Sequence, residues 1–379
     1  MKQPRLWTGA GQSFRPQGAS KDRDKKYSLA RKGAEVGKFI RFFGEMRRKD
    51  IQEAGGKAAN LGELTRGGFN VPPGFCVTSD ALFHHIKENS LQREIYAIVR
   101  SFDYEDFGGM EERTARIRAL ISRAPIPADL LDEIRKAISE LNRTDPGFVA
   151  VRSSVAVRDS SISSFPGMME TYHYLMGEEE IVEHIKKCWA SLWTSRATLN
   201  RHHKNIDHNL GLIAPIVQKM VDSEVAGVLF TANPITSVRE EMVVEANWGL
   251  GESVVSGKSM NDFYVIEKEP LRLKERRISK KTLMICFDEE KGLGRREMAV
   301  SPDRMDAPTL TEEQVLELGE IGMKIESLFG YPQDIEWAYE GGDLHILQSR
   351  NIRTLAEDKG QKQSPGRTEP GLFSKPSRK

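Results

Sequence analysis

The sequence predicts an α+β protein, because helical and strand patterns dominate different parts of the chain. Residues 81–141 and 179–203 carry apolar side chains at helical spacing, with Pro125 and Pro127 marking a break in the first range. From Ile213 onward, short apolar runs of strand length recur.

Length and composition narrow the class of protein. A chain of 379 residues can hold two domains, and its net charge of +1 gives no drive toward nucleic acid or membrane. No apolar run approaches the roughly 20 residues of a membrane span, and the start of the chain lacks a secretion signal. Cys76, Cys188 and Cys286 are odd in number and lack metal-ligand spacing, so a cytoplasmic protein is expected.

The first ordered segment carries a candidate anion site. Residues 1–45 are polar and basic and predict a flexible arm, which Gly55-Gly56-Lys57 follows after a short gap. Glycines at the start of a helix free backbone N–H groups, and the lysine adds an ammonium. A glycine-rich turn with an exposed lysine explains this piece equally well, and the Walker pattern is incomplete.

The stretch from Phe148 to Tyr174 is a second candidate phosphate site. Phe148 to Val151 is typical of a buried strand, which we expect to end at Arg152 and to open into a Ser- and Gly-rich loop. The arginine offers forked charged donors, and the loop offers hydroxyl and N–H groups. Arg-Ser-Ser alone would more often be a surface turn, so the rest of the chain must decide.

Two alternating segments near the end of the chain predict a hairpin. Asp334 and Glu336 share one face of the first strand, and Gln348 and Arg350 share one face of the second. If residues 341–343 form a three-residue loop, Glu336 lies opposite Gln348 and Asp334 lies opposite Arg350. Carboxylate and amide oxygens suit Mg²⁺, and the arginine suits phosphate. The alternative is a surface salt-bridge ladder.

Seven motifs in order resemble one family. They are GGKAANLGELTRGGFNVPPGFCVTSDAL, AVRSS, SFPGMMETY, CWASLWTSRA, IVQKMVDSEVAGVLFTANPIT, VVEANWGLGESVVSGK and QDIEW with ILQSR. Together they resemble the N-terminal ATP-grasp region of phosphoenolpyruvate synthase, whose relatives include pyruvate phosphate dikinase and rifampin phosphotransferase. The resemblance implies a two-lobed ATP-grasp fold with lobes at 55–210 and 211–354. The polar tail at 355–379 is expected to be disordered.

The resemblance also implies roles for individual residues. Lys57, Arg152 and Arg350 match the family's catalytic phosphate-binding cations, and Glu336, Gln348 and Asp334 match positions around Mg²⁺. The expected ATP contacts are Lys57, Arg152, Gly167, Thr171, Gln218, Glu336, Gln348 and Arg350. Glu245 matches an acidic strand position without a firm role.

Other features depart from the full-length relatives. Ala58 replaces a common glycine, and residues 155–164 differ from the usual synthase sequence, which affects the substrate more than ATP binding. Relatives carry a phosphorylated histidine after Thr or Ser, and a barrel of about 250 residues. The eight histidines here all lack that context: His84, His85, His173, His184, His202, His203, His208 and His345.

We therefore expect the ATP-binding subunit of a split phosphotransferase, as in phenylphosphate synthase. It would pass phosphoryl or pyrophosphoryl from Mg–ATP to a histidine on a partner chain, for transfer to pyruvate, phenol or a similar acceptor. The alternatives are a non-catalytic nucleotide sensor and a self-contained ATP-grasp ligase.

Overall fold

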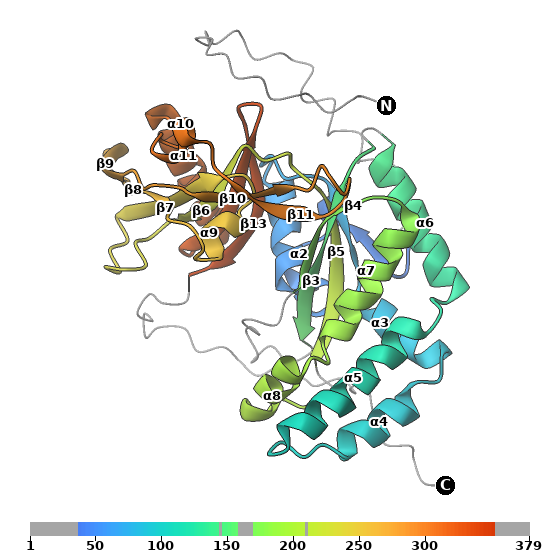
Figure 1. The fold of residues 1–379 in the computed structure, drawn as a ribbon. Coiled ribbons are helices and arrows are strands. Elements are labelled where there is room, and N and C mark those ends of the chain that lie inside the picture. Colours follow the sequence, from blue (N-terminus) through green and yellow to red (C-terminus); the bar gives the residue numbers. More distant parts are fainter. Residues whose placement is uncertain (1–36, 144–145, 158–169, 209–210, 353–379) are drawn as a thin grey trace. The chain divides into compact units, whose positions relative to one another are not determined.

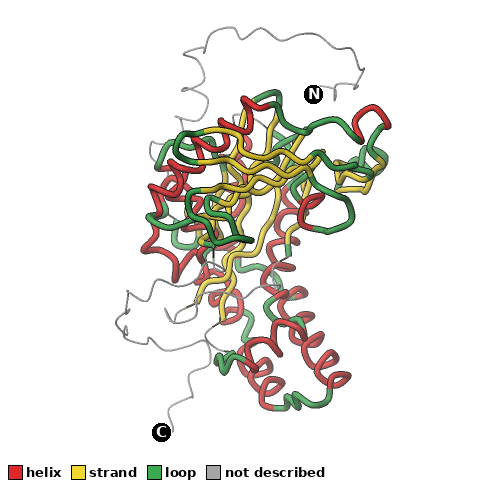
Figure 2. Tube along the Cα trace, turned by 90° about the vertical axis from the view of Figure 1, so that its left-hand side faces the viewer, coloured by secondary structure: helices red, strands yellow, loops and turns green. Residues whose placement is uncertain are grey.

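Two antiparallel sheets organise the chain (Figure 1). The structure is a computed structural model that describes residues 37–143, 146–157, 170–208 and 211–352. All of these residues fall within one structural unit, 34–379. Figure 2 shows the strands in the middle of the view, with helices on either side. The predicted α+β class is confirmed.

The first sheet has five strands in the order β1-β2-β5-β3-β4. Their bounds are Ile40–Phe42 for β1, Gly74–Val77 for β2, Val149–Val157 for β3, Thr171–Leu175 for β4 and Gly211–Lys219 for β5. Helices α3 Ser79–Glu88, α6 Ala128–Asn142 and α7 Glu178–Ser191 pack against this sheet. Helices α4 Gln92–Arg100 and α5 Phe107–Arg123 pack on other helices and share the same apolar cluster. Helix α8, Ser195–His203, follows α7. A cluster that includes Trp189 and Trp193 fills the space beneath these helices.

The second sheet has six strands in the order β13-β12-β6-β7-β8-β9. Their bounds are Val225–Phe230 for β6, Glu241–Trp248 for β7, Asp262–Glu267 for β8, Arg272–Arg277 for β9, Gln333–Glu340 for β12 and Asp343–Asn351 for β13. Helix α11, Glu312–Phe329, packs on this sheet through residues such as Leu318 and Ile325. It begins with a Thr311–Gln314 capping box and ends at Gly330, which has a φ of 69°.

Helix α2, Ile51–Arg66, contacts both sheets. Ala58, Leu61 and Leu64 form its apolar stripe and pack in the second sheet's core, together with Ile216 of β5. Asn60 Nδ2 donates a hydrogen bond to the Ser349 carbonyl on β13 at 2.7 Å. Two 3₁₀ turns, Phe43–Glu45 and Arg48–Asp50, precede the helix. The helix therefore fixes strands from both sheets against one another.

A small hairpin also reaches from the second half of the chain to the first sheet. Strands β10, Leu283–Phe287, and β11, Arg295–Ala299, pair with one another near the short helices α9, Glu252–Val255, and α10, Pro302–Met305. The Phe287 ring lies 4.8 Å from the Phe148 ring and 4.9 Å from the Tyr174 ring. Residues 267–305 carry no sequence pattern that predicts this hairpin.

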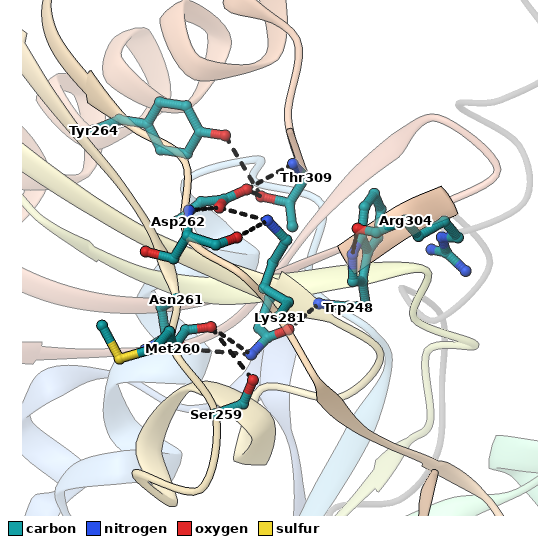
Figure 3. A network of polar contacts seen from close by, with 11 residues as sticks. Trp248, Ser259, Met260, Asn261, Asp262, Tyr264, Lys281, Arg304 and Thr309 are labelled. Carbon is teal, nitrogen blue, oxygen red and sulfur yellow. Dashed lines mark hydrogen bonds and ion pairs between the residues drawn. The ribbon is translucent and has the colours of Figure 1, made fainter. Parts of the chain in front are cut away.

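A buried ion pair ties the segment after β9 back to β8 (Figure 3). Asp262 Oδ1 accepts hydrogen bonds from Lys281 Nζ at 2.6 Å and from the Ser279 N–H at 2.9 Å. Its other oxygen accepts from the N–H and hydroxyl of Thr309, at 2.8 and 2.9 Å. Neither charged side chain is exposed to solvent. The pair thus fixes the segment around Ser279 and Lys281 against β8.

Several predicted boundaries need correction. Strand β3 does not end at Arg152 but continues to Val157, since Ser153 and Ser154 are buried within the sheet. The helix predicted over 179–203 is two helices, α7 and α8, separated at residues 192–194.

Two domain limits also differ from the observed sheets. Strand β1 lies inside the predicted arm, of which residues 1–36 fall outside the described part, as do the tail residues 355–379. Strand β5 belongs to the first sheet, so the chain passes to the second sheet after Lys219 and not at residue 211. Among the described helices, none combines the length and apolarity that a membrane crossing needs.

Candidate functional site

Arg152 joins the two sheets. From the middle of β3, its Nη2 donates hydrogen bonds to Glu336 Oε2 at 2.6 Å and to Gln348 Oε1 at 3.3 Å. Its Nη1 donates to the Leu347 carbonyl at 3.2 Å and to Gln218 Oε1 at 3.5 Å. The side chain is 12% exposed, and its Nε has no hydrogen-bond partner among the described residues. The cation is thus fixed between oxygen atoms from β5, β12 and β13.

The hairpin of β12 and β13 supplies most of these oxygens. Glu336 lies opposite Gln348, and Asp334 lies opposite Arg350, as the alternating pattern predicts. Gln348 Nε2 donates to Glu336 Oε1 at 2.8 Å, and Arg350 Nε donates to Asp334 Oδ2 at 2.7 Å. The predicted pairing is confirmed.

The loop that was expected to set this register is different. It has two residues, Gly341 and Gly342, with φ of 58° and 85°, so Asp343 already belongs to β13. A bulge next to Glu336 leaves Leu347 without a paired residue on β12. The shorter loop and the extra bulge residue compensate for each other, which is why the pairing agrees although the loop length does not.

Lys57 is positioned by a break in α2. Gly55 has φ 76° and ψ 163°, so the helix restarts just before Lys57. Ser154 Oγ donates to the Ala54 carbonyl at 2.9 Å and accepts from the Ala58 N–H at 3.4 Å, which satisfies backbone groups on both sides of the break. A Cβ at Gly55 would lie 2.3 Å from that hydroxyl, so only glycine fits without movement.

The Lys57 ammonium has an unusual environment. Burial, and then the Arg152 cation, lower its pKa to about 8. It makes no ion pair with any residue in the described ranges. At neutral pH it therefore remains mainly a cation.

The carboxylates respond to the same charges. Burial raises the pKa of Glu336, but Arg152 and Lys57 outweigh burial and hold that pKa below its ordinary value. Burial raises the pKa of Asp334, and Arg350 offsets this only in part. Glu336 is therefore ionised at neutral pH.

Two further predicted residues, Thr171 and Gln218, lie beside Arg152 in the first sheet. Thr171 is the cross-strand neighbour of Arg152 on β4. Gln218 donates its Nε2 hydrogen to the Pro72 carbonyl at 3.3 Å and turns its oxygen to Arg152. Gly167 lies outside the described residues.

Glu245 shares a face of the second sheet with Glu336. Val228 pairs with both residues, so one strand separates the two carboxylates. Glu245 Oε2 accepts a hydrogen bond from Asn261 Nδ2 at 3.0 Å. No contact among the described residues brings it to Arg152 or Lys57.

Sequence reasoning missed a group of three interacting residues, of which His173 lies close enough to Arg152 for that cation to lower its pKa. They are His173 on β4, Glu252 at the start of α9 and Arg295 on β11. Thr171 pairs with Arg152, and side chains alternate along a strand. His173, two residues after Thr171, would therefore have been placed on the same face of the first sheet as Arg152. Glu252 lies within the motif VVEANWGLGESVVSGK but received no role, and Arg295 comes from a segment without a local signal. Only the three-dimensional fold brings the two residues together, with Arg295 Nε 2.8 Å from Glu252 Oε2.

The oxygen ligands suit a hard cation. Among the described residues there is no group of three or more His, Cys, Asp and Glu side chains arranged to hold a metal. The Glu336 carboxylate and Gln348 amide oxygen are nevertheless adjacent, with Asp334 on the same strand face. This chemistry fits Mg²⁺ that also takes oxygens from a bound phosphate.

Three cations around a carboxylate and amide pair define a class of site. It suits a polyphosphate bound together with a divalent cation. The site is built from α2, β3, β5 and the β12–β13 hairpin, so both sheets contribute.

Comparison with known proteins gives the family. The sequence model of the family described as "Pyruvate phosphate dikinase, AMP/ATP-binding domain" matches residues 51–369, so the chain belongs to this family. The probable phosphoenolpyruvate synthase of Pyrococcus horikoshii is 40% identical over 361 residues, which cover 84% of this chain and 44% of that protein. The rifampicin phosphotransferase of Bacillus cereus is 39% identical over 318 residues, covering 84% of this chain and 36% of that protein. The chain thus spans less than half the length of these relatives.

Proposed function

We propose that this chain binds Mg–ATP between its two sheets, in an ATP-grasp fold, and serves as the ATP-using part of a phosphotransferase. The observation that carries the proposal is the contact of Arg152 with Glu336 and Gln348. It brings an arginine of the first sheet, which could bind phosphate, against oxygens of the second sheet that could bind a metal ion. Membership of a family described by AMP/ATP binding supports the same ligand.

Each residue has a distinct task in this proposal. Lys57, Arg152 and Arg350 bind phosphate oxygens and neutralise the charge that spreads over the transferring group. Thr171 and Gly167 line the phosphates, and Gln218 lies on the strand beside the base and ribose. Bound Mg²⁺, held by Glu336 and Gln348 with Asp334 nearby, would supply charge neutralisation across neighbouring phosphates.

The proposed acceptor is a histidine of a partner chain. None of the eight histidines here follows Thr or Ser. The phosphorylated partner would then pass the group to pyruvate, phenol or another small molecule. The contact between the two chains would be transient and polar, because the carrier must leave to reach a second active site.

Two other functions make different predictions. A nucleotide sensor would bind ATP without passing phosphate onward, but the complete set of Asp334, Glu336, Gln348 and Arg350 favours catalysis. A self-contained ligase would release ADP only with a carboxylate substrate, and the order of the dikinase-like motifs favours phosphotransfer.

Labelled ATP tests the proposal. The chain alone should bind Mg–ATP and hydrolyse it slowly, because cleft closure excludes water. Adding the products of neighbouring genes should accelerate ATP consumption and place acid-labile phosphate on a histidine of one partner. Label on one of this chain's own histidines, or full-rate product formation by the chain alone, would refute the two-chain arrangement. Absence of ATP binding would refute the function itself.

A further inference from the structure

Two buried nitrogen atoms near the proposed phosphate site have no hydrogen-bond partner among the described residues. They are Arg152 Nε and His173 Nδ1. His173 Nδ1 lies 3.6 Å from Glu252 Oε2, which is too long for a good hydrogen bond. Buried polar atoms are normally paired, so such a group in one place indicates a polar ligand.

A bulge in β4 directs His173 toward this region. Thr171 pairs with Arg152, but further along the strand His173 and Tyr174 together oppose Ala150. Tyr174 has a φ of 56°, a conformation that costs energy in a residue with a side chain. Bulges re-aim side chains and occur often next to functional sites.

Glu252 approaches His173 from the second half of the chain. Arg295 on β11 holds the carboxylate, with Arg295 Nε 2.8 Å from Glu252 Oε2. Burial, then Arg152 and Arg295, lower the pKa of His173 to about 3, so the imidazole is neutral at physiological pH. The pair therefore offers a carboxylate acceptor and an uncharged ring with one donor and one acceptor nitrogen.

The pair borders two regions of different chemistry. The Arg152 cation is close enough to His173 to help lower the pKa of that ring. Tyr174, which follows His173, and Leu250, two residues before Glu252, belong to an apolar cluster with Ile285, Phe148, Met220, Leu283 and Phe287. A nucleotide combines matching parts: charged phosphates, a sugar with hydroxyl groups, and a flat base.

We propose that His173 and Glu252 bind the ribose hydroxyls of the nucleotide and select ribonucleotides over deoxyribonucleotides. This inference rests on the proposed ATP site and adds its sugar specificity. A site built to hydrogen-bond a hydroxyl rejects an analogue that lacks it, because its own polar groups are then left unpaired.

Calorimetric titration of the whole chain with the Mg²⁺ complexes of ATP, 2′-deoxyATP and 3′-deoxyATP tests the proposal. The unmodified chain should bind ATP about tenfold or more tightly than at least one deoxy analogue. Glu252→Gln and His173→Leu should each remove most of this preference while leaving the affinity for that analogue within about twofold. Glu297→Gln is the matched control, since Glu297 lies on β11 in an exposed ion pair with Lys258.

The outcomes are distinguishable. Equal affinity of the unmodified chain for ATP and both analogues would overturn sugar selection while leaving the ATP site intact. Equal weakening of all three nucleotides by both variants would show a merely structural role and would also overturn it. Failure of the unmodified chain to bind any of the three would refute the proposed function as well. If Glu252→Gln does not fold, His173→Leu alone decides.

Discussion

Two charged networks in this molecule differ in how completely their polar atoms are paired. In the first, Asp262 and Lys281 are wholly buried, and each oxygen of the Asp262 carboxylate accepts two hydrogen bonds (Figure 3). In the second, the Glu336 side chain is 33% exposed and Arg152 keeps a buried nitrogen without a partner in the described part of the chain. Lys57 adds a cation close to both of them.

The difference separates a structural role from a binding role. A buried pair that satisfies its own atoms has nothing left to offer a ligand, so it serves the fold. The second network holds three cations, Lys57, Arg152 and Arg350, against the two carboxylates of Asp334 and Glu336. It therefore keeps excess positive charge and spare donors, which a bound polyphosphate can use.

Breaking the fully paired network of Asp262 and Lys281 should have the largest effect, a loss of folding stability. Asp262→Ala leaves the Lys281 ammonium buried without its carboxylate, so the free energy of unfolding should fall by about 3–5 kcal/mol. Urea unfolding followed by circular dichroism measures this loss. Glu94→Ala removes the exposed partner of Arg116, 3.1 Å away, and should cost no more than about 1 kcal/mol. Equal losses in the two variants would contradict the contrast.

Breaking the network around Arg152 and Glu336 should instead lower the turnover of ATP. Glu336→Ala removes a proposed metal ligand that is partly exposed, so the fold should persist. Mg²⁺-dependent turnover of ATP should fall by about 100-fold or more, since metal charge stabilisation is worth several kcal/mol. The assay uses saturating Mg–ATP with the partner present. Unchanged turnover would remove Glu336 from the site.

The phosphate-binding cations should distinguish nucleotides by charge. Arg152→Met and Lys57→Met should each weaken ATP binding about tenfold or more, because hydrogen bonds between charged groups are lost. AMP lacks the distal phosphates and should be affected much less. Competition binding with both nucleotides gives the two ratios, and Arg116→Met, at an exposed position of α5, is the control. An equal loss for ATP and AMP would place these cations elsewhere along the nucleotide.

The smallest expected effect is a pH dependence from Lys57. Its pKa is about 8, so raising the pH through this value removes a positive charge from the site. ATP affinity should be flat up to about pH 7 and then fall by at most about tenfold per pH unit. Dissociation constants from pH 7 to 9.5 measure this, and Lys57→Met should flatten the curve. The same fall in Lys57→Met would assign the titration to another group.

Sequence reasoning succeeded where spacing alone determines geometry. Strand alternation placed Glu336 opposite Gln348, and the Gly-Gly-Lys pattern located the start of the regular part of α2. These features depend on residues close together in the chain, so their period or spacing is visible without the fold.

It failed where structure depends on distant partners. Strand β3 continues past Arg152 because Ser154 finds backbone partners on α2, which no local pattern reveals. His173 is directed by a bulge, and Glu252 and Arg295 meet it only through the β10–β11 hairpin. The buried Asp262–Lys281 pair was equally invisible, since charged residues in a sequence usually indicate surface.

The bulge at Leu347 has a consequence for how this hairpin tolerates genetic change. The acceptor that Leu347 offers to Arg152 is a main-chain carbonyl, so no point substitution can remove it. Loss of the whole residue would remove the bulge and let the two strands pair regularly, with Glu336 still opposite Gln348. Substitutions of Leu347 should therefore leave this hydrogen bond in place. Deletion of its codon in frame would instead alter the Arg152 contact and leave the pairing of the neighbouring residues unchanged.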